Sequence, residues 1–107
     1  MVRTISRAIL FLVIVTAVSG CENVVQKATG YFLKQKMIEI CGEDDKPCLA
    51  AVAEQYDACE TKYADEWTAY IHAGPAKEDA LLDAYMARLF SCVVDKDGDA
   101  YFSYKPD

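Results

Sequence analysis

Four cysteines limit the folds that this chain can adopt. They follow residue 21 and are Cys41, Cys48, Cys59 and Cys92. A hydrophobic core built only from residues 21–107 is marginal in size and usually needs cross-links or a metal ion to become stable. An even number of cysteines indicates disulfides in an exported protein, whereas the same cysteines in a cytosolic protein indicate catalysis or metal binding. The compartment of the protein therefore decides how they are interpreted.

The N-terminus has the pattern of a secretory signal. Arg3 and Arg7 are its charged residues, and an apolar run of eleven residues follows from Ala8 to Val18, interrupted only by Thr16. At a rise of ~1.5 Å per residue this run spans roughly 16 Å, about half of the ~30 Å hydrocarbon core of a bilayer. Its shortness, and the small residues after it, favour a cleaved signal over the alternative of a membrane helix that stays attached.

The small residues lead directly into a cysteine, in the order Val18-Ser19-Gly20-Cys21. This segment resembles the lipobox of bacterial lipoproteins, with Val18 in the place of the usual leucine. The resemblance covers residues 1–21. It implies that Cys21 receives a diacylglyceryl group and that residues 1–20 are removed by a cut just before it. Two or three acyl chains on one cysteine give stable membrane attachment.

The position after the cysteine bears on the destination of the protein. It is Glu22, whereas lipoproteins that stay at the inner membrane of enteric bacteria tend to carry Asp there. The resemblance therefore favours the outer membrane, with a domain of residues 21–107 that faces the periplasm.

The part of the chain that follows residue 20 is acidic. It contains nine of the eleven basic residues and all seventeen acidic ones, so its formal net charge is −8. Nucleic-acid binding requires Lys and Arg to neutralise phosphates, and this composition argues against it. The acidity suits a basic protein partner or divalent cations.

Three segments have helical periodicity, which predicts an all-α domain. The first covers residues 23–41, and the side expected to face inward carries Val24, Ala28, Tyr31, Phe32, Ile38 and Cys41. The second covers residues 47–72 and has an aromatic-rich stripe of Leu49, Val52, Tyr56, Cys59, Tyr63, Trp67 and Tyr70. The third covers residues 76–94, with Leu81, Tyr85, Leu89 and Cys92 along one side. We expect a small three-helix bundle with an irregular C-terminal tail.

The positions of the cysteines predict how they pair. If the second and third helices form an antiparallel hairpin at Gly74, Cys59 lies fifteen residues before the turn and Cys92 eighteen after it. That offset is ~4.5 Å along the helix axis and allows a disulfide, whereas Cys48 would be ~12 Å out of step with Cys92. Cys41 then pairs with Cys48 across the short loop between the first two helices.

No catalytic constellation is visible in the sequence. Redox catalysis by the cysteines favours a CxxC pair, and the chain has none. Zinc held by the cysteines and His72 is disfavoured because the spacings match no ligand motif. His72, the only histidine, is interpreted as a solvated or capping residue. Nucleophile elbows, phosphate loops and HExxH are also absent, so we expect a protein that is not an enzyme and has no cofactor.

An acidic segment follows the third helix. Its sequence, Asp95-Lys96-Asp97-Gly98-Asp99, resembles the start of an EF-hand calcium loop. Ala100 stands where that loop needs glycine, and Pro106 stands where it needs a bidentate glutamate. A polar turn is therefore the favoured interpretation, and Asp95, Asp97 and Asp99 are weak candidates for metal ligands.

These observations predict a non-catalytic, lipid-anchored protein of the cell envelope that binds a protein partner. It would act as an accessory subunit of an envelope assembly or as an immunity-type protein. The alternative is a lipoprotein that binds calcium or a small ligand through the acidic turn at residues 95–99.

Overall fold

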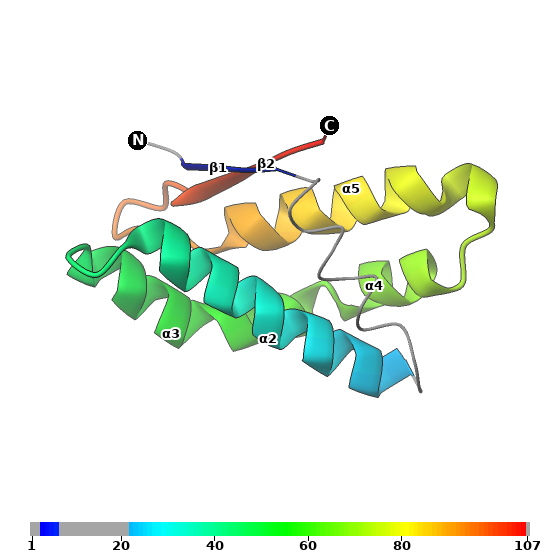
Figure 1. The fold of residues 1–107 in the computed structure, drawn as a ribbon, viewed down its shortest axis with the longest axis horizontal. Coiled ribbons are helices and arrows are strands. Elements are labelled where there is room, and N and C mark those ends of the chain that lie inside the picture. The colour runs from blue at the N-terminus through cyan, green and yellow to red at the C-terminus, as the bar shows by residue number, and fades with distance from the viewer. Residues whose placement is uncertain (1–2, 7–21, 107) are drawn as a thin grey trace.

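Four helices and two short strands form the structure, a computed structural model that describes residues 3–6 and 22–106 (Figure 1). In chain order the elements are β1 (Arg3–Ser6), α2 (Glu22–Cys41), α3 (Lys46–Lys62), α4 (Ala64–Ile71), α5 (Pro75–Cys92) and β2 (Phe102–Lys105). The domain is thus mostly helical, as predicted. The expectation of three helices and an irregular tail is wrong, because the second predicted helix is divided in two and the tail contains a strand.

The helices α2 and α3 lie side by side in opposite directions (Figure 1). Gly42 ends α2 with a φ of 82°, a conformation that glycine adopts without strain, and its N–H donates to the carbonyl of Ile38 at 3.2 Å. Asp45 caps α3, because its side chain accepts the N–H of Cys48 at 3.3 Å. Pro47 in the first turn has no N–H that would be left unpaired. These local signals fix the tight turn.

The segment predicted as one second helix changes direction at Tyr63. The N–H of Tyr63 still donates to Cys59, and the N–H of Trp67 donates to Tyr63, both at 3.2 Å. Neither proline nor glycine lies at this position. The break accompanies aromatic packing, because the ring of Trp67 on α4 lies 5.2 Å from that of Tyr85 on α5. The sequence alone predicts continuity at this position, and the structure instead has a break next to tertiary aromatic contacts.

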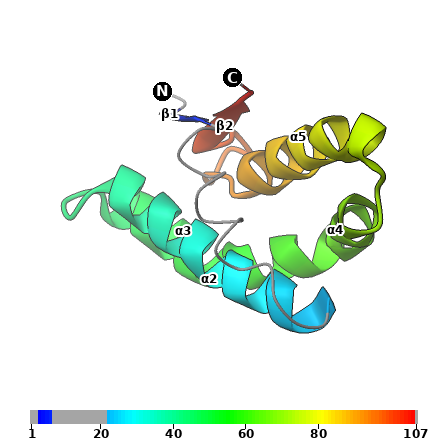
Figure 2. The same cartoon turned by 45° about the vertical axis from the view of Figure 1, so that its right-hand side comes forward.

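A second hairpin joins α4 to α5 (Figure 2). It turns at Gly74, and Pro75 occupies the first turn of α5. Glu78 in the same turn has the charge that a helix N-terminus favours. This turn lies where the sequence predicts it, so α5 returns along α4 and reaches the end of α3.

The chain turns back after α5 and forms β2. Gln55 of α3 fixes this return, because its side-chain amide donates to the carbonyl of Val94 and accepts the Val94 N–H, each at 2.9 Å. Phe102 is fully buried, and the hydroxyl of Tyr104 donates to Asp83 of α5 at 2.9 Å. β2 pairs in parallel with β1, with Arg3 opposite Phe102 and Ser6 opposite Lys105. The described strands thus join the two ends of the sequence.

The core lies between the α2–α3 hairpin, the α4–α5 hairpin and the small sheet of β1 and β2. Its largest fully buried side chains are Ile5, Leu33, Met37, Tyr56, Trp67, Leu82, Tyr85, Met86, Leu89, Phe90 and Phe102. The aromatic stripe of the second segment is largely confirmed, since most of its members are buried. The predicted inner face of the first helix is only partly correct. Cys41 is buried and Ile38 packs against the core. Tyr31 and Phe32 are exposed, however, and Leu33 and Met37 are buried in their place. Gly30 is also buried, and its missing side chain lets Glu60 of α3 approach closely.

Candidate functional site

The predicted lipidation site lies outside the described residues. Cys21 and the apolar run of residues 8–18 fall in the part that the structure does not describe, whereas Glu22, the residue after Cys21, begins α2. Among residues 3–6 and 22–106, no helix is long and apolar enough to cross a membrane. The lipid anchor therefore remains a prediction from the sequence.

All four cysteines among the described residues form disulfides. Cys41 pairs with Cys48, with their Cα atoms 5.6 Å apart, and Cys59 pairs with Cys92, with their Cα atoms 5.9 Å apart. These are the two pairs that the helix geometry predicts. The first closes the turn between α2 and α3, and the second joins the end of α3 to the end of α5. The thiols are therefore used for cross-linking in this structure.

The acidic segment 95–99 is a tight turn. One oxygen of the Asp95 carboxylate accepts the N–H groups of Asp97 at 2.8 Å and of Asp99 at 3.0 Å. Gly98 has a φ of 85°, and the N–H of Asp95 donates to the carbonyl of Asp99 at 2.8 Å. This is the hydrogen bonding of a polar turn that closes on its own aspartate.

The predicted candidates for metal ligands do not converge. Asp95, Asp97 and Asp99 do not form a group that could hold a metal ion, and no other three Asp, Glu, His or Cys side chains do so within the described part of the chain. His72 is exposed at the C-terminal cap of α4, which is where the sequence places it.

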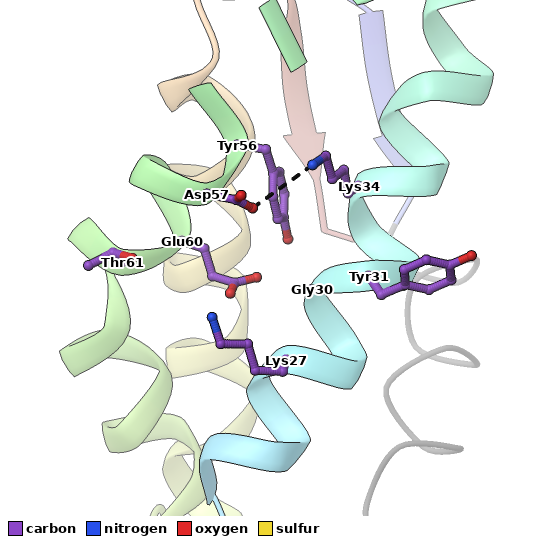
Figure 3. Close-up of a pocket in the computed structure, with 8 residues that line it drawn as sticks. All are labelled: Lys27, Gly30, Tyr31, Lys34, Tyr56, Asp57, Glu60 and Thr61. Atoms are coloured by element: carbon purple, nitrogen blue, oxygen red, sulfur yellow. Dashed lines mark ion pairs between the residues drawn. The ribbon is translucent and has the colours of Figure 1, made fainter. Parts of the chain in front are cut away.

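A pocket of about 300 Å³ opens between α2 and α3. Residues from two turns of each helix line it: Lys27, Gly30, Tyr31 and Lys34 from α2, and Tyr56, Asp57, Glu60 and Thr61 from α3. In Figure 3 the carboxylate of Glu60 and the ammonium group of Lys27 point towards each other in the space between the helices. The ring of Tyr31 points away from this space.

Glu60 is the most unusual residue of this pocket. It is 8% exposed, and a Cβ at Gly30 would lie 1.8 Å from its Oε2 atom. The carboxyl group therefore occupies the space that the missing side chain of Gly30 leaves on α2. Burial raises the pKa of Glu60, while the nearby charge of Lys27 and the hydroxyl of Tyr56 oppose the rise. This carboxyl group takes up a proton more readily than a solvated glutamate.

Tyr56 forms the floor of the pocket. It is almost completely buried, and its hydroxyl makes no hydrogen bond of normal geometry with the described residues. Burial is the main cause of its raised pKa, and the nearby Tyr85 and Glu60 add to the rise. The hydroxyl of Tyr56 therefore lies buried next to the carboxyl group of Glu60, and each group affects the pKa of the other.

Two lysines stand at the edges of the pocket, on one side of α2. Lys34 lies 3.9 Å from Asp57 of α3, whereas Lys27 approaches Glu60. The pocket therefore presents cationic and anionic groups together. It has the chemistry to hold a small polar molecule, with ammonium groups for an anionic part and a carboxyl group that can donate or accept a hydrogen bond.

This pocket could not be predicted from the stripe of the second helix, because Glu60 lies outside the residues expected to face inward. The available signal was Gly30, since glycine inside a helix costs about 1 kcal/mol relative to alanine and often marks a close approach. Nothing in the sequence shows which residue of another helix approaches a glycine. The partner of Gly30 therefore becomes known only in the fold.

Tyr31, which also lines the pocket, forms an exposed aromatic pair with its neighbour Phe32 on α2. Tyr31 is 62% exposed and Phe32 is 46% exposed, and their rings meet edge to face with centroids 5.7 Å apart. Exposed aromatic side chains are enriched at protein interfaces, where they supply contact area at a low entropic cost.

No known family model, curated protein or solved structure matches this chain. Its function must therefore be inferred from these features.

Proposed function

We propose that this protein is a non-catalytic lipoprotein of the bacterial cell envelope, cut before Cys21 and anchored by acyl chains on that residue. The observation that carries the proposal is the order of a basic start, a short apolar run and small residues that end at Cys21. The outer membrane is the favoured site, with the domain facing the periplasm. Both disulfides support this compartment, because disulfides persist where the environment is oxidising.

Within the envelope, the domain binds a protein partner as an accessory or immunity-type protein. The exposed pair of Tyr31 and Phe32 supports a protein contact. The net charge of −8 after residue 20 favours a partner that presents a basic surface. Because α2 begins directly after Cys21, the anchored domain would hold this helix close to the membrane that carries the partner.

The Cys21→Ser variant tests the anchor. It removes the thiol that receives the lipid, so we expect an uncut precursor without acyl chains that accumulates in place of the shorter form. Ser19→Ala is the matched control, because it keeps a small residue in the segment and should be processed like the parent. If Cys21→Ser is still cut before residue 21 and fractionates with membranes as the parent does, the proposal is wrong.

Cross-linking tests the partner surface. A photoreactive phenylalanine analogue at position 31 or 32 should give a cross-link to one specific envelope protein in living cells. The same analogue at Ala84, an exposed position of α5, serves as the control and should give none. Equal yields from both helices would show that the aromatic pair has no special role.

A second candidate function is the binding of a small ligand between α2 and α3. The observation that favours it is the pocket in which the ammonium groups of Lys27 and Lys34 lie near the carboxyl group of Glu60. This places a ligand site away from the acidic turn at residues 95–99. Calorimetric titration with small carboxylates and with inorganic phosphate should show saturable heat that Lys27→Gln abolishes and Lys62→Gln does not. Absence of heat at millimolar concentrations would reject this candidate.

A further inference from the structure

The strand β1 occupies a prepared site on the domain. Its backbone pairs in parallel with β2, and the N–H of Arg3 donates to the carbonyl of Tyr101 at 3.1 Å. Ile5 is 2% exposed and belongs to the core. Figure 1 shows the two strands at one edge of the molecule, across the end of α5. The strand β1 is thus held through its backbone and through the side chain of Ile5.

The side chain of Arg3 gives this site its charge preference. Its guanidinium group forms an ion pair with Asp45, the capping residue of α3, and its Nη1 atom donates to the sulfur of Cys48 at 2.8 Å. The bond from Arg3 is the main reason why the pKa of Asp45 lies below its usual value. The site therefore combines three features: the edge of β2, an apolar socket for Ile5, and the carboxylate of Asp45, which binds the side chain two positions before Ile5.

Removal of residues 1–20 would take β1 away from this site. What remains is the backbone edge of β2 at residues 102–105, the empty socket of Ile5 and the carboxylate of Asp45. An unpaired strand edge next to an apolar socket is a template for the addition of an extended segment from another chain. The negative charge of the domain attracts a cationic segment to it.

We propose that the processed domain binds its protein partner by strand addition to β2. The partner contributes an extended segment, parallel to β2, with Arg or Lys in the place of Arg3 and an aliphatic residue two positions later in the place of Ile5. In the uncut chain β1 fills this site and blocks it. This inference rests on the proposed removal of residues 1–20 and names the surface and the chemistry through which the partner is recognised.

The test uses a fluorescent peptide with the sequence of residues 2–7, Val-Arg-Thr-Ile-Ser-Arg. It is titrated into the processed lipoprotein, purified in detergent, whose first residue has been determined by mass spectrometry. Saturable binding is expected, whereas the uncut Cys21→Ser protein should bind poorly because β1 competes within the same chain. Adding Ile5→Asp to that uncut protein should release β1 and restore binding of the peptide.

Variants of the peptide and of the domain show whether the binding is specific. An aspartate in the place of the peptide isoleucine should weaken binding by more than about thirtyfold, because it puts a charge into the apolar socket. Asp45→Asn keeps the helix cap but loses the charge, and it should weaken binding by about three- to tenfold. Asp44→Asn, an equal change of charge on the neighbouring exposed residue, is the matched control and should leave binding unchanged.

The outcomes separate this inference from the proposed function. A lipoprotein that starts at Cys21 but does not bind the peptide would overturn the strand-addition site and leave the anchor intact. If Asp44→Asn and Asp45→Asn weaken peptide binding equally, the peptide is attracted only by the general negative charge of the domain. That result would also overturn the strand-addition site. Sedimentation that shows the processed protein to be a dimer, with β2 paired to β2, would assign the edge to a second copy instead of a partner.

Discussion

The carboxyl group of Glu60 on α3 fills the place where Gly30 on α2 has no side chain. A Cβ at Gly30 would meet Oε2 of Glu60 at 1.8 Å and its carboxyl carbon at 2.9 Å. This fit sets how closely the two helices approach. It also explains why a residue with poor helix propensity stands in the middle of α2.

A double-mutant cycle measures this relationship. In the parent, Gly30→Ala must displace the Glu60 side chain from a buried position, which offsets the ~1 kcal/mol gained in helix propensity. In the Glu60→Ala background the same methyl group enters free space, and Gly30→Ala should stabilise the protein. Urea denaturation should therefore give a coupling free energy of about 1–3 kcal/mol. Additivity within about 0.5 kcal/mol would show that the two residues do not constrain each other.

The buried carboxyl group predicts a dependence of stability on pH. Burial raises the pKa of Glu60 above the ordinary value of 4.5, so the folded state binds this proton more tightly than the unfolded state does. Its contribution is complete below pH 4.5 and is lost as the pH rises through the folded pKa. Glu60→Gln removes this titration and should raise the melting temperature at neutral pH but not in the acid range.

Glu54→Gln is the control for this measurement, because Glu54 lies exposed on the same helix. Its melting temperature should follow that of the parent at every pH. A constant difference between Glu60→Gln and the parent across the pH range would mean that Glu60 has no raised pKa in the fold.

The two disulfides should contribute unequally to stability. Cys59 and Cys92 close a loop of 33 residues, and Cys41 and Cys48 close one of 7. Loop entropy alone gives roughly 3.7 kcal/mol for the long bridge and roughly 2.4 kcal/mol for the short one. Denaturant unfolding should show a larger loss when both cysteines of the long bridge are replaced by alanine. An equal or smaller loss would show that native-state effects outweigh loop entropy.

Two aspartates of the acidic turn at residues 95–99 should contribute differently to stability. Asp95→Ala removes the acceptor of two backbone N–H groups and should cost about 1–2 kcal/mol. Asp97→Asn keeps the backbone N–H that bonds to Asp95, so thermal stability should stay unchanged with or without millimolar calcium. A calcium-dependent rise in the melting temperature of the parent, lost in Asp97→Asn, would support the alternative of a calcium-binding lipoprotein.

Features that depend on helical periodicity could be predicted from the sequence. The pairing of Cys59 with Cys92 is confirmed, although the continuous helix assumed for it breaks at Tyr63. The stripe that contains Tyr56 and Trp67 follows from the rise and turn of an α-helix. These quantities do not change with the tertiary environment. The sequence also contains the local signals for the turns at Gly42 and Gly74, and the structure has turns at both.

Features that depend on distant partners could not be predicted. The break at Tyr63 lies next to the packing of Trp67 on Tyr85, and Glu60 is buried against a glycine thirty residues earlier in the chain. The pairing of β1 with β2 joins segments almost a chain length apart. Short strands carry too little pattern for such a contact to be visible. The candidate pocket was missed for the same reason, since each helix supplies half of its lining.

Mass spectrometry of the protein extracted from bacterial membranes tests the proposed lipid anchor most directly. We expect an N-terminal peptide that begins at Cys21, carries two or three acyl chains on that residue and lacks residues 1–20. The same spectrum under non-reducing conditions should contain Cys41 linked to Cys48 and Cys59 linked to Cys92. Recovery of a membrane-bound protein that still contains Arg3–Ser6, with Cys21 unmodified, would contradict the account.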